Sequence, residues 1–258
     1  MIIQKINYIL QEIDAPIGFK AKYMLEKIIK LPFVILKQPL SYLFHEDYIL
    51  KNRDGIWKIK AHSDFDYAVA SYHEPELEPL FRNTDGICFD IGAHVGKWSI
   101  YLAKMSEYNQ VYAFEPNPET FKYLVENIKL NGLNNVFAYN IGTSSQKGIA
   151  NFTATSMAAM SHIDNKDSLQ INTLDLDSFI QENRIEVNDI KLIKIDVEGH
   201  EFEVLIGMQK TLEKLSNDVK IICEVTQNKD KLLEFMQERG YFGILTQTGQ
   251  DYLFVKRD

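Results

Sequence analysis

The sequence predicts an α/β fold built on a doubly wound, mostly parallel sheet of seven strands. From about residue 86 onward, short apolar runs typical of strands alternate with amphipathic segments typical of helices. The last two runs are separated only by a short turn around Gly249, which predicts a hairpin and an antiparallel strand at one edge of the sheet. The 258 residues are enough for one large core, and we divide them into a helical N-terminal arm, 1–60, and a single domain, 61–258.

Seven apolar runs are the expected strands. They cover residues 87–91, 111–115, 136–141, 192–197, 219–225, 241–246 and 252–255. The early runs are almost continuously apolar, as is usual for parallel strands that helices cover on both faces.

The helical segments between these runs carry start and stop signals. Asn117 is a candidate N-cap, Pro118 occupies the first helical position, and Gly132 ends that helix. Further helices are expected from about Glu201 and after Asn228. Strand and helix therefore alternate throughout the domain.

Residues 1–60 differ from the rest of the chain. Prolines divide them into short elements, so we expect helical and then irregular structure. The apolar segment 28–44 contains Lys30, Lys37 and two prolines, which argues against a membrane-spanning helix. We expect this arm to be buried or to form a homodimer contact. Because residues 1–44 carry six lysines against three acids, peripheral contact with a lipid surface is the alternative.

Charge and cysteine content exclude several classes of function. The net charge of -8 makes nucleic acid an unfavourable partner. Cys88 and Cys223 each lie in an apolar run, so we expect two reduced, buried thiols rather than a disulfide or a metal site. The first residues do not resemble a secretory signal peptide. Together these features predict a cytoplasmic protein.

The stretch CFDIGAHVGKWS, residues 88–99, predicts a strand, a glycine turn and a helix, the usual shape of a cofactor-binding loop. A phosphate-binding P-loop is disfavoured, since Gly92 and Gly96 are one residue too close and Trp98 stands where Ser or Thr is required. Lys97 then fits a solvated position in the first turn of the helix.

A dinucleotide-binding loop is disfavoured as well. It requires a third glycine, and here Ala93 and His94 lie between the two that are present. Asp90, at the end of the strand, would also face the two phosphates of a dinucleotide, and like charges in a partly buried site are costly. S-adenosylmethionine reverses this argument, because its sulfonium and ammonium groups are cations that Asp90 attracts.

A second acid ends the next expected strand, in the stretch AFEPNP. Glu115 lies about 20 residues beyond the glycine loop, where a carboxylate accepts hydrogen bonds from two ribose hydroxyls. NAD-binding folds share this feature, so Glu115 indicates an adenosine ligand and Asp90 favours S-adenosylmethionine.

Four stretches, FDIGAHVG, YAFEPNPETFKYLVENIKLNG, LDSFI and IKLIKIDVEGHEFEVLIGM, make residues 67–225 resemble the FkbM-type methyltransferases. The resemblance implies a class I, Rossmann-like methyltransferase fold and, usually, O-methylation of hydroxyls on sugars or other natural products. By this likeness the cofactor site comprises residues of the glycine loop, of the acid that follows and of the end of the third strand: Asp90, Gly92, Ala93, His94, Gly96, Glu115, Pro116, Asn140 and Ile141. The last two are expected beside the adenine.

The motif IDVEGHE ends the fourth expected strand, where ligands of open α/β sheets bind. Asp196 and Glu198 are therefore expected to face the methionine end of the cofactor or the acceptor. Transfer to an alcohol needs a group that removes a proton, and the candidates are Asp196, His200 and His162. His162 lies in a polar stretch, 156–167, that is expected to fold over the site. We expect no bound metal, because the alternating side chains of Asp196, Glu198, His200 and Glu201 cannot all converge.

Two other classes of function remain as alternatives. One is a non-catalytic adenosine-ligand-binding or assembly protein, in which the apolar arm forms a dimer. The other is an NAD-dependent oxidoreductase, which Asp90 and the missing third glycine disfavour. The leading prediction is an S-adenosylmethionine-dependent O-methyltransferase whose acceptor is a small molecule or a glycan.

Overall fold

The computed structural model describes residues 46–61, 63, 66, 69–70, 74–153, 162–163 and 169–256. The predictions for the first 45 residues, namely the helical arm, its dimer contact and its contact with lipid, lie outside these ranges. Within the described residues, no helix has the length and apolar character needed to cross a membrane.

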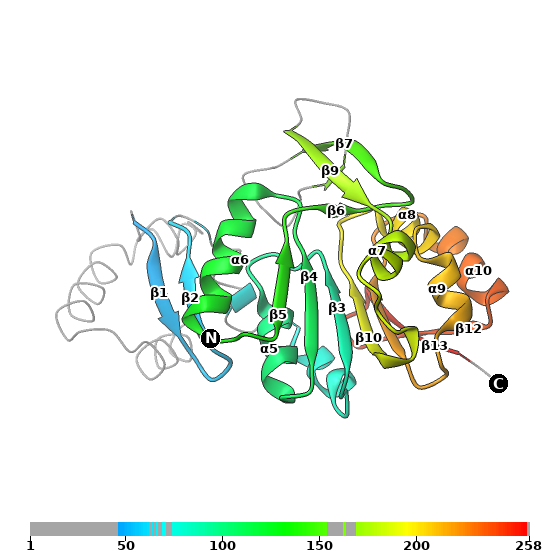
Figure 1. Ribbon diagram of the computed structural model, residues 1–258, viewed down its shortest axis with the longest axis horizontal. Coiled ribbons are helices and arrows are strands. Elements are labelled where there is room, and N and C mark those ends of the chain that lie inside the picture. Colours follow the sequence, from blue (N-terminus) through cyan, green and yellow to red (C-terminus); the bar gives the residue numbers. More distant parts are fainter. Residues whose placement is uncertain are drawn as a thin grey trace.

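A seven-stranded sheet forms the centre of the molecule, with the strand order β12-β13-β11-β10-β3-β4-β5 (Figure 1). Its strands are β3 (Ile87–Ile91), β4 (Gln110–Phe114), β5 (Val136–Tyr139), β10 (Ile190–Ile195), β11 (Lys220–Glu224), β12 (Tyr241–Leu245) and β13 (Asp251–Lys256). The five strands from β5 to β11 are parallel to one another. The predicted fold class is therefore confirmed, and the predicted strands differ from the observed ones by one or two residues at their ends.

The C-terminal hairpin is also present and lies at one edge of the sheet, as predicted. β13 pairs antiparallel with β11 on one side and with β12 on the other. The antiparallel strand therefore lies one place inside the edge, and β12 is the outermost strand. The turn at Gly249, with a φ of 83°, joins the two.

Helices cover both faces of the sheet (Figure 1). One face packs against α7 (Leu176–Glu182), α8 (Glu201–Ile206), α9 (Gln209–Lys214) and α10 (Lys229–Glu238). The opposite face packs against α5 (Lys97–Met105), α6 (Pro118–Leu130) and the 3-10 helix η2 (Pro75–Phe81). Asn117 caps α6 by accepting a hydrogen bond from the amide of Glu119, as the sequence predicts.

Residues 48–59 form a β-hairpin, which corrects the expected helical and irregular structure in this part of the arm. β1 (Tyr48–Lys51) and β2 (Ile56–Ile59) pair antiparallel, and Figure 1 shows them beside α6. Leu50, Trp57 and Ile59 are buried in the same core cluster as residues of α5 and α6. Alternate side chains of the two strands thus form an apolar face. This period-two pattern is hard to recognise in the sequence because each strand has only four residues.

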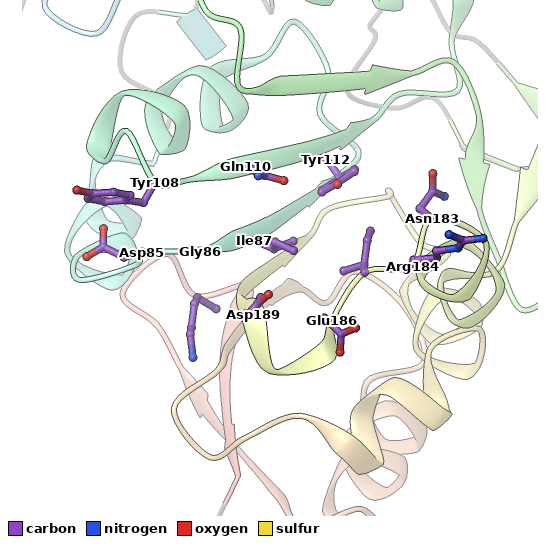
Figure 2. A pocket seen from close by; sticks show the side chains of 12 residues that line it. Asp85, Gly86, Ile87, Tyr108, Gln110, Tyr112, Asn183, Arg184, Glu186 and Asp189 are labelled. Atoms are coloured by element: carbon purple, nitrogen blue, oxygen red, sulfur yellow. The ribbon is translucent and has the colours of Figure 1, made fainter.

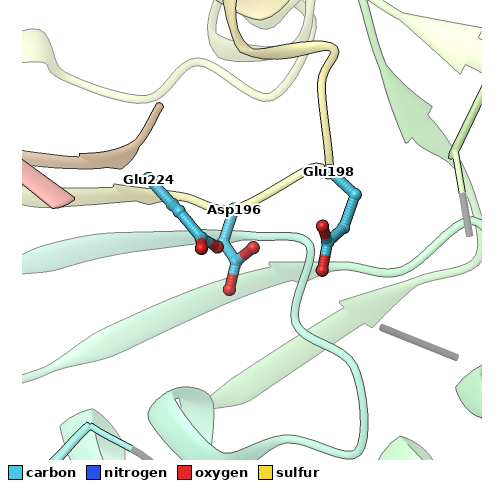
Figure 3. A group of neighbouring side chains, drawn as sticks. All are labelled: Asp196, Glu198 and Glu224. Atoms are coloured by element: carbon cyan, nitrogen blue, oxygen red, sulfur yellow. The ribbon is translucent and has the colours of Figure 1, made fainter. Parts of the chain in front are cut away.

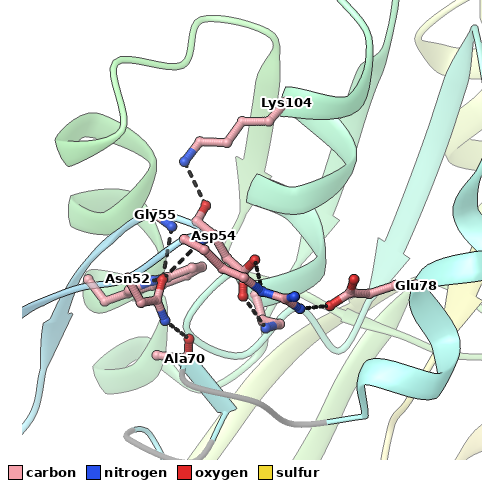
Figure 4. Close-up of polar contacts among 9 residues, drawn as sticks. Asn52, Asp54, Gly55, Ala70, Glu78 and Lys104 are labelled. Carbon is pink, nitrogen blue, oxygen red and sulfur yellow. Dashed lines mark hydrogen bonds and ion pairs between the residues drawn. The ribbon is translucent and has the colours of Figure 1, made fainter. Parts of the chain in front are cut away.

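Polar contacts hold the turn of this hairpin in place (Figure 4). The Asn52 side chain accepts hydrogen bonds from the amides of Asp54 and Gly55 and donates one to the carbonyl of Ala70. Asn127 of α6 and Asn131, which caps the C-terminus of that helix, lie one turn apart and bond to the backbone of β2. The hairpin is therefore part of the folded domain rather than a separate arm.

The solvated position expected for Lys97 is wrong. Its side chain is 3% exposed and its Nζ lies 3.1 Å from Oδ2 of Asp54, in the turn of the hairpin. A buried ammonium needs such a partner, because removing a charge from water costs several kcal/mol, of order 5 or more. The partner precedes Lys97 by 43 residues, so local sequence around the helix start does not indicate the pair.

A smaller sheet, not expected from the sequence, lies near the carboxyl ends of the central strands (Figure 1). It has the order β6-β9-β7-β8, formed by β6 (Gly142–Thr143), β9 (Leu169–Leu174), β7 (Gly148–Thr153) and β8 (His162–Ile163). Much of the polar stretch 156–167, which the sequence places over the site, lies outside the described residues. Cys88 and Cys223 are buried free thiols on β3 and β11, as predicted.

Candidate functional site

The two motif-bearing strands, β3 and β10, are neighbours in the middle of the sheet. From β3 the chain adds β4 and β5 in one direction, and from β10 it adds β11 and β13 in the other. In folds with this reversal of strand order, ligands usually bind beyond the carboxyl ends of the two strands at the switch point, which here are β3 and β10. The motifs DIGAHVG and IDVEGHE, which follow β3 and β10, therefore lie side by side at the carboxyl edge of the sheet.

The glycine loop after β3 touches the end of β10. A Cβ atom on Gly92 would lie 1.7 Å from the carbonyl oxygen of Asp196, so only glycine fits here. The amides of Gly92 and Ala93 both donate to the carbonyl of Phe114, which fixes the loop against β4. His94 has a φ of 50°, a left-handed conformation uncommon for a residue with a Cβ.

Glu115, directly after β4, is held by the same loop. Its Oε2 accepts a hydrogen bond from the amide of His94, and its Oε1 accepts one from the amide of Asn117, each at 2.9 Å. Burial raises the pKa of Glu115 to about 7, against the lowering effect of these two bonds. Each oxygen keeps a second lone pair, so the carboxylate is oriented and can still accept hydroxyl donors.

Asn140 and Ile141 lie just beyond β5 rather than at its end. The Asn140 amide nitrogen donates to the carbonyls of Glu115 and Pro116, at 2.8 and 3.1 Å. Ile141 is partly buried against the larger core cluster. Asn140 thus shapes the segment that carries Glu115, a role that sequence position alone does not indicate.

Asp90 is fully buried within β3. Its Oδ2 accepts a hydrogen bond from Oγ of Ser99, in the first turn of α5, at 2.5 Å. Its Oδ1 has no hydrogen-bond partner among the described residues. Burial raises the pKa of Asp90, while the nearby Lys194 lowers it. The result is a buried acid, one residue before the end of β3, with one carboxylate oxygen that has no hydrogen bond among the described residues.

Lys194 is a candidate site residue that sequence reasoning missed. It lies in β10 directly across from Asp90 of β3, and its side chain is 2% exposed. Its Nζ is 2.8 Å from Oδ2 of Asp196. Burial lowers its pKa, but the carboxylates of Asp196, Asp90 and Glu74 raise it further, so the net direction is upward. The signal available in the sequence was a lysine within the apolar run IKLIKI.

Acidic residues from neighbouring strands line the carboxyl edge of the sheet beside Lys194. Lys194 is level with Ile222 of β11, so Asp196 is level with Glu224, and Glu224 pairs in register with Asp251 of β13. Burial raises the pKa of Glu224 to about 10, and Asp196 raises it as well. Three strands thus each place an acid on the same face.

Asp196, Glu198 and Glu224 each place a carboxylate oxygen within 4.8 Å of the others (Figure 3). Glu198 has a φ of 52°, which turns the chain sharply after Asp196. This group differs from the four residues weighed in the sequence, because Glu224 comes from another strand. Lys194 already supplies a cation to Asp196, and we assign no metal to the group; the absence of a metal stays a prediction.

His200 and Glu201 point to other partners. Nε2 of His200 is 2.9 Å from Oγ of Ser144, which follows β6, and its Nδ1 is 3.7 Å from Glu203. Burial lowers the pKa of His200. Oε1 of Glu201 accepts hydrogen bonds from the amide of Gly199 and from Thr226. Of the three proposed proton acceptors, Asp196 is the one whose backbone contacts the glycine loop.

His162 is described only through its backbone. It lies in β8 and pairs with Thr153 of β7. Its side chain is outside the described residues, so its proposed catalytic role stays a prediction.

A cavity of about 370 Å³ lies at the other end of the central strands (Figure 2). It is lined by residues that begin β3, β4 and β10, among them Gly86, Gln110 and Lys191. Because ligands of this fold class bind at the carboxyl ends, this cavity is separate from the candidate site.

The residues at the carboxyl ends suit an adenosine ligand with a positive charge. Glu115 has acceptor capacity left for ribose hydroxyls, and Asp90 has a buried oxygen that no described residue hydrogen-bonds. The excess of carboxylates near Asp90 and Asp196 favours a cation rather than a phosphate. The fold and this site define an S-adenosylmethionine-dependent methyltransferase.

Comparison with known proteins places the chain within that class. Residues 90–242 match the methyltransferase FkbM domain. The hexuronic acid methyltransferase AglP of Haloferax volcanii is 30% identical over 173 residues, which is 66% of this chain and 70% of AglP. The chain belongs to the FkbM methyltransferase family. The oxidoreductase and non-catalytic alternatives are therefore set aside.

The chain is also similar to one further protein over a short stretch of sequence and to one solved structure. A tRNA(Phe) (4-demethylwyosine(37)-C(7)) aminocarboxypropyltransferase of Methanocaldococcus jannaschii is 50% identical over 70 residues, 27% of this chain and 28% of that protein. The crystal structure of M. jannaschii TYW2 in complex with AdoMet is 21% identical, with a TM-score of 0.42 over 82% of this chain and 87% of that one.

Proposed function

We propose that the protein methylates a hydroxyl group of a sugar or glycan, with Asp196 as the residue that receives the hydroxyl proton. Bound S-adenosylmethionine supplies a methyl group on a positively charged sulfur. A single observation carries the choice of Asp196: its amide donates to the carbonyl of Ile91 and its carbonyl contacts Gly92, so it lies where the two motif loops meet. The sugar acceptor is supported by the likeness to AglP.

Each residue of the site then has a distinct task. Glu115 orients the adenosine part by accepting hydrogen bonds from its ribose. Asp90 contributes negative charge near the methionine part. Asp196 would take the proton of the acceptor hydroxyl, and holding the reacting groups in line would supply much of the acceleration.

The experiment that tests this proposal uses methyl-labelled S-adenosylmethionine with sugars and with glycans from host cells. We expect label in an alkali-stable ether of the sugar, and its loss with Asp196→Asn while binding of the uncharged product S-adenosylhomocysteine persists. His200→Gln serves as the comparison, because the His200 ring contacts Ser144. Label in an ester, an amine or no sugar product contradicts O-methylation of a hydroxyl.

The N-terminal arm and the cellular location are proposed separately. We propose that residues 1–45 mediate a dimer in the cytoplasm. Removing these residues while keeping the hairpin should change the mass in solution from dimer to monomer, and an unchanged mass contradicts this role.

A further inference from the structure

Aromatic rings stack from strand to strand on the face of the sheet that packs against α7. Phe89 of β3, Tyr112 of β4 and Phe137 of β5 lie in register, and their ring centroids are 5.5 and 5.3 Å apart. Phe114 of β4 and Tyr139 of β5 stack beside them at 5.4 Å. Both stacks therefore end at β5, where Phe137 and Tyr139 lie on the same face of one strand.

β5 is an outermost strand, and among the described residues no further strand pairs with it. Phe137 is 41% exposed there, although its ring continues a stack that begins in the core. Single exposed apolar residues are common on protein surfaces and need no special explanation. Phe137 differs because polar sites adjoin this aromatic edge, formed by Phe137 and Tyr139, at both of its ends.

The candidate cofactor site adjoins the edge at the carboxyl end of the strand. The carbonyl of Tyr139 accepts a hydrogen bond from the amide of Glu115 at 3.1 Å. The next residue, Asn140, bonds to the segment that carries Glu115. An acceptor whose hydroxyl reaches the methyl group thus has the aromatic edge beside it.

The cavity of about 370 Å³ adjoins the edge at the amino end. The Tyr112 ring, which stacks on Phe137, belongs to the lining of this cavity. Figure 2 shows Gln110 and Tyr112 on β4, with Asn183 and Arg184 beyond the end of α7. The cavity therefore joins an aromatic ring to amide and guanidinium groups.

This combination of groups suits a sugar. A pyranose ring has a face of C–H groups that packs on aromatic rings and a rim of hydroxyls that donate and accept hydrogen bonds. The cavity also contains the acids Asp85, Glu186 and Asp189, which can accept bonds from hydroxyls. The same acids disfavour a polyanion such as nucleic acid.

We propose that the aromatic edge and the cavity together form a binding track for a glycan chain whose methylated unit lies at the cofactor site. The inference rests on the proposed function, since it assumes that the acceptor is a sugar. β4 has five residues and therefore spans about 17 Å, a distance that a single sugar ring does not cover. The acceptor that fills the track is an oligosaccharide of several units rather than a free sugar.

The test is affinity chromatography on the immobilised full-length protein. The ligands are neutral glycans released from host cells and sorted by length. We expect retention by the wild type to increase with chain length. Phe137→Ala should weaken the binding of long chains about fivefold, because a stacking contact is lost. Gln110→Ala should weaken only the longest chains, which reach the cavity.

Phe242→Ala is the matched control. Phe242 is also an exposed phenylalanine on an outermost strand, at 46% exposure, but it lies on β12 at the opposite edge of the sheet. This variant should retain glycans as the wild type does. In methyl transfer, Phe137→Ala should raise the KM for long chains by the factor seen in binding, and Phe242→Ala should leave it unchanged.

The outcomes separate this inference from the proposed function. Equal retention of long chains by the wild type and Phe137→Ala overturns the track, as does equal retention of short and long chains by the wild type. Retention of single-stranded oligothymidylate through Phe137, with glycans passing unretained, overturns it in favour of nucleic acid. If long glycans are retained through Phe137 but no sugar is methylated, the proposed function fails and the track stands. Should Phe137→Ala not fold, Phe137→Leu keeps an apolar side chain without the ring, and the same loss is expected.

Discussion

The backbone amide of His94 donates a hydrogen bond to Oε2 of Glu115, which ties the glycine loop to the end of the adjacent strand. The bond links the two parts of the predicted cofactor site directly. Glu115 is therefore both a ligand-binding candidate and a structural acceptor for the loop.

Replacing Glu115 tests both roles. Glu115→Ala removes an acceptor for ribose hydroxyls, and hydrogen bonds to a charged group contribute about 1.5–3 kcal/mol each, so affinity for S-adenosylhomocysteine should fall about tenfold or more. Calorimetric titration measures this loss. Glu119→Ala removes an exposed acid in α6 and is the matched control. Equal affinities of the two variants would contradict the placement of the ribose.

The pH dependence of stability provides a second test of Glu115. Its folded-state pKa of about 7 lies above the usual 4.5, so the native protein binds more protons than the unfolded chain between these values. Stability should accordingly fall as the pH rises through this window. Urea unfolding at several pH values should show a weaker fall in Glu115→Gln than in the wild type. Parallel curves would show that Glu115 titrates normally.

Two glycines with the same φ separate backbone strain from steric overlap. Gly92 and Gly249 both have a φ of 83°, but only Gly92 has an atom in the place of a Cβ. Gly249→Ala should therefore cost only the left-handed strain of about 1–2 kcal/mol. Gly92→Ala should cost several kcal/mol more, of order 3 or above, and abolish cofactor binding. Thermal unfolding and calorimetry measure the two effects, and similar stabilities would contradict the close contact with Asp196.

The buried pair of Lys97 and Asp54 should matter for stability. Asp54→Ala leaves an ammonium that is 3% exposed without this carboxylate, and breaking such a pair costs about 3–5 kcal/mol. The exposed pair of Lys122 and Glu119 is the control, where Lys122→Ala should cost about 1 kcal/mol or less. Urea unfolding compares them, and a small effect at both sites would mean that water reaches Lys97.

His200 should titrate below its usual pKa of 6.5, because burial disfavours the charged ring. The native state then binds fewer protons than the unfolded chain, so this contribution to stability is present above pH 6.5 and is lost as the pH falls from 6.5 through the lower pKa of the folded state. NMR titration, with His200→Gln to assign the signal, measures the value. Glu203→Gln should lower it further, since Glu203 favours the charged ring. A rise in that variant contradicts the ion pair.

The features that could be predicted from the sequence are local along the chain. The run into Gly92, the N-cap Asn117 and the acid Glu115 each lie beside the strand or turn that explains them. Buried parallel strands are recognisable in a sequence as apolar runs. The alternation of these runs with helical segments then indicates the fold class. For these reasons the seven strands, and the meeting of the two motifs at the carboxyl ends of β3 and β10, were predictable.

The remaining features depend on residues that only the fold brings together. Lys194 lies across from Asp90, which belongs to β3, a strand far from β10 in the sequence. Glu224 lies beside Asp196 only because of the register between β10 and β11. Lys97 was assigned to solvent because Asp54 belongs to a hairpin of two short strands. Pairings of this kind follow from sheet order, which a single sequence does not specify.

The stretch of sequence that matches the family model is shorter than the stretch that forms the folded domain. The family match begins at residue 90 and ends at residue 242, inside β3 and inside β12. A chain cut to that match would lack β13 and would open the core that Trp57 of the hairpin fills. The matched stretch contains the candidate site residues, while the flanking residues complete the sheet and the core around it. Grafting the motif segment onto another protein should therefore transfer the site only when the hairpin and the last strand go with it.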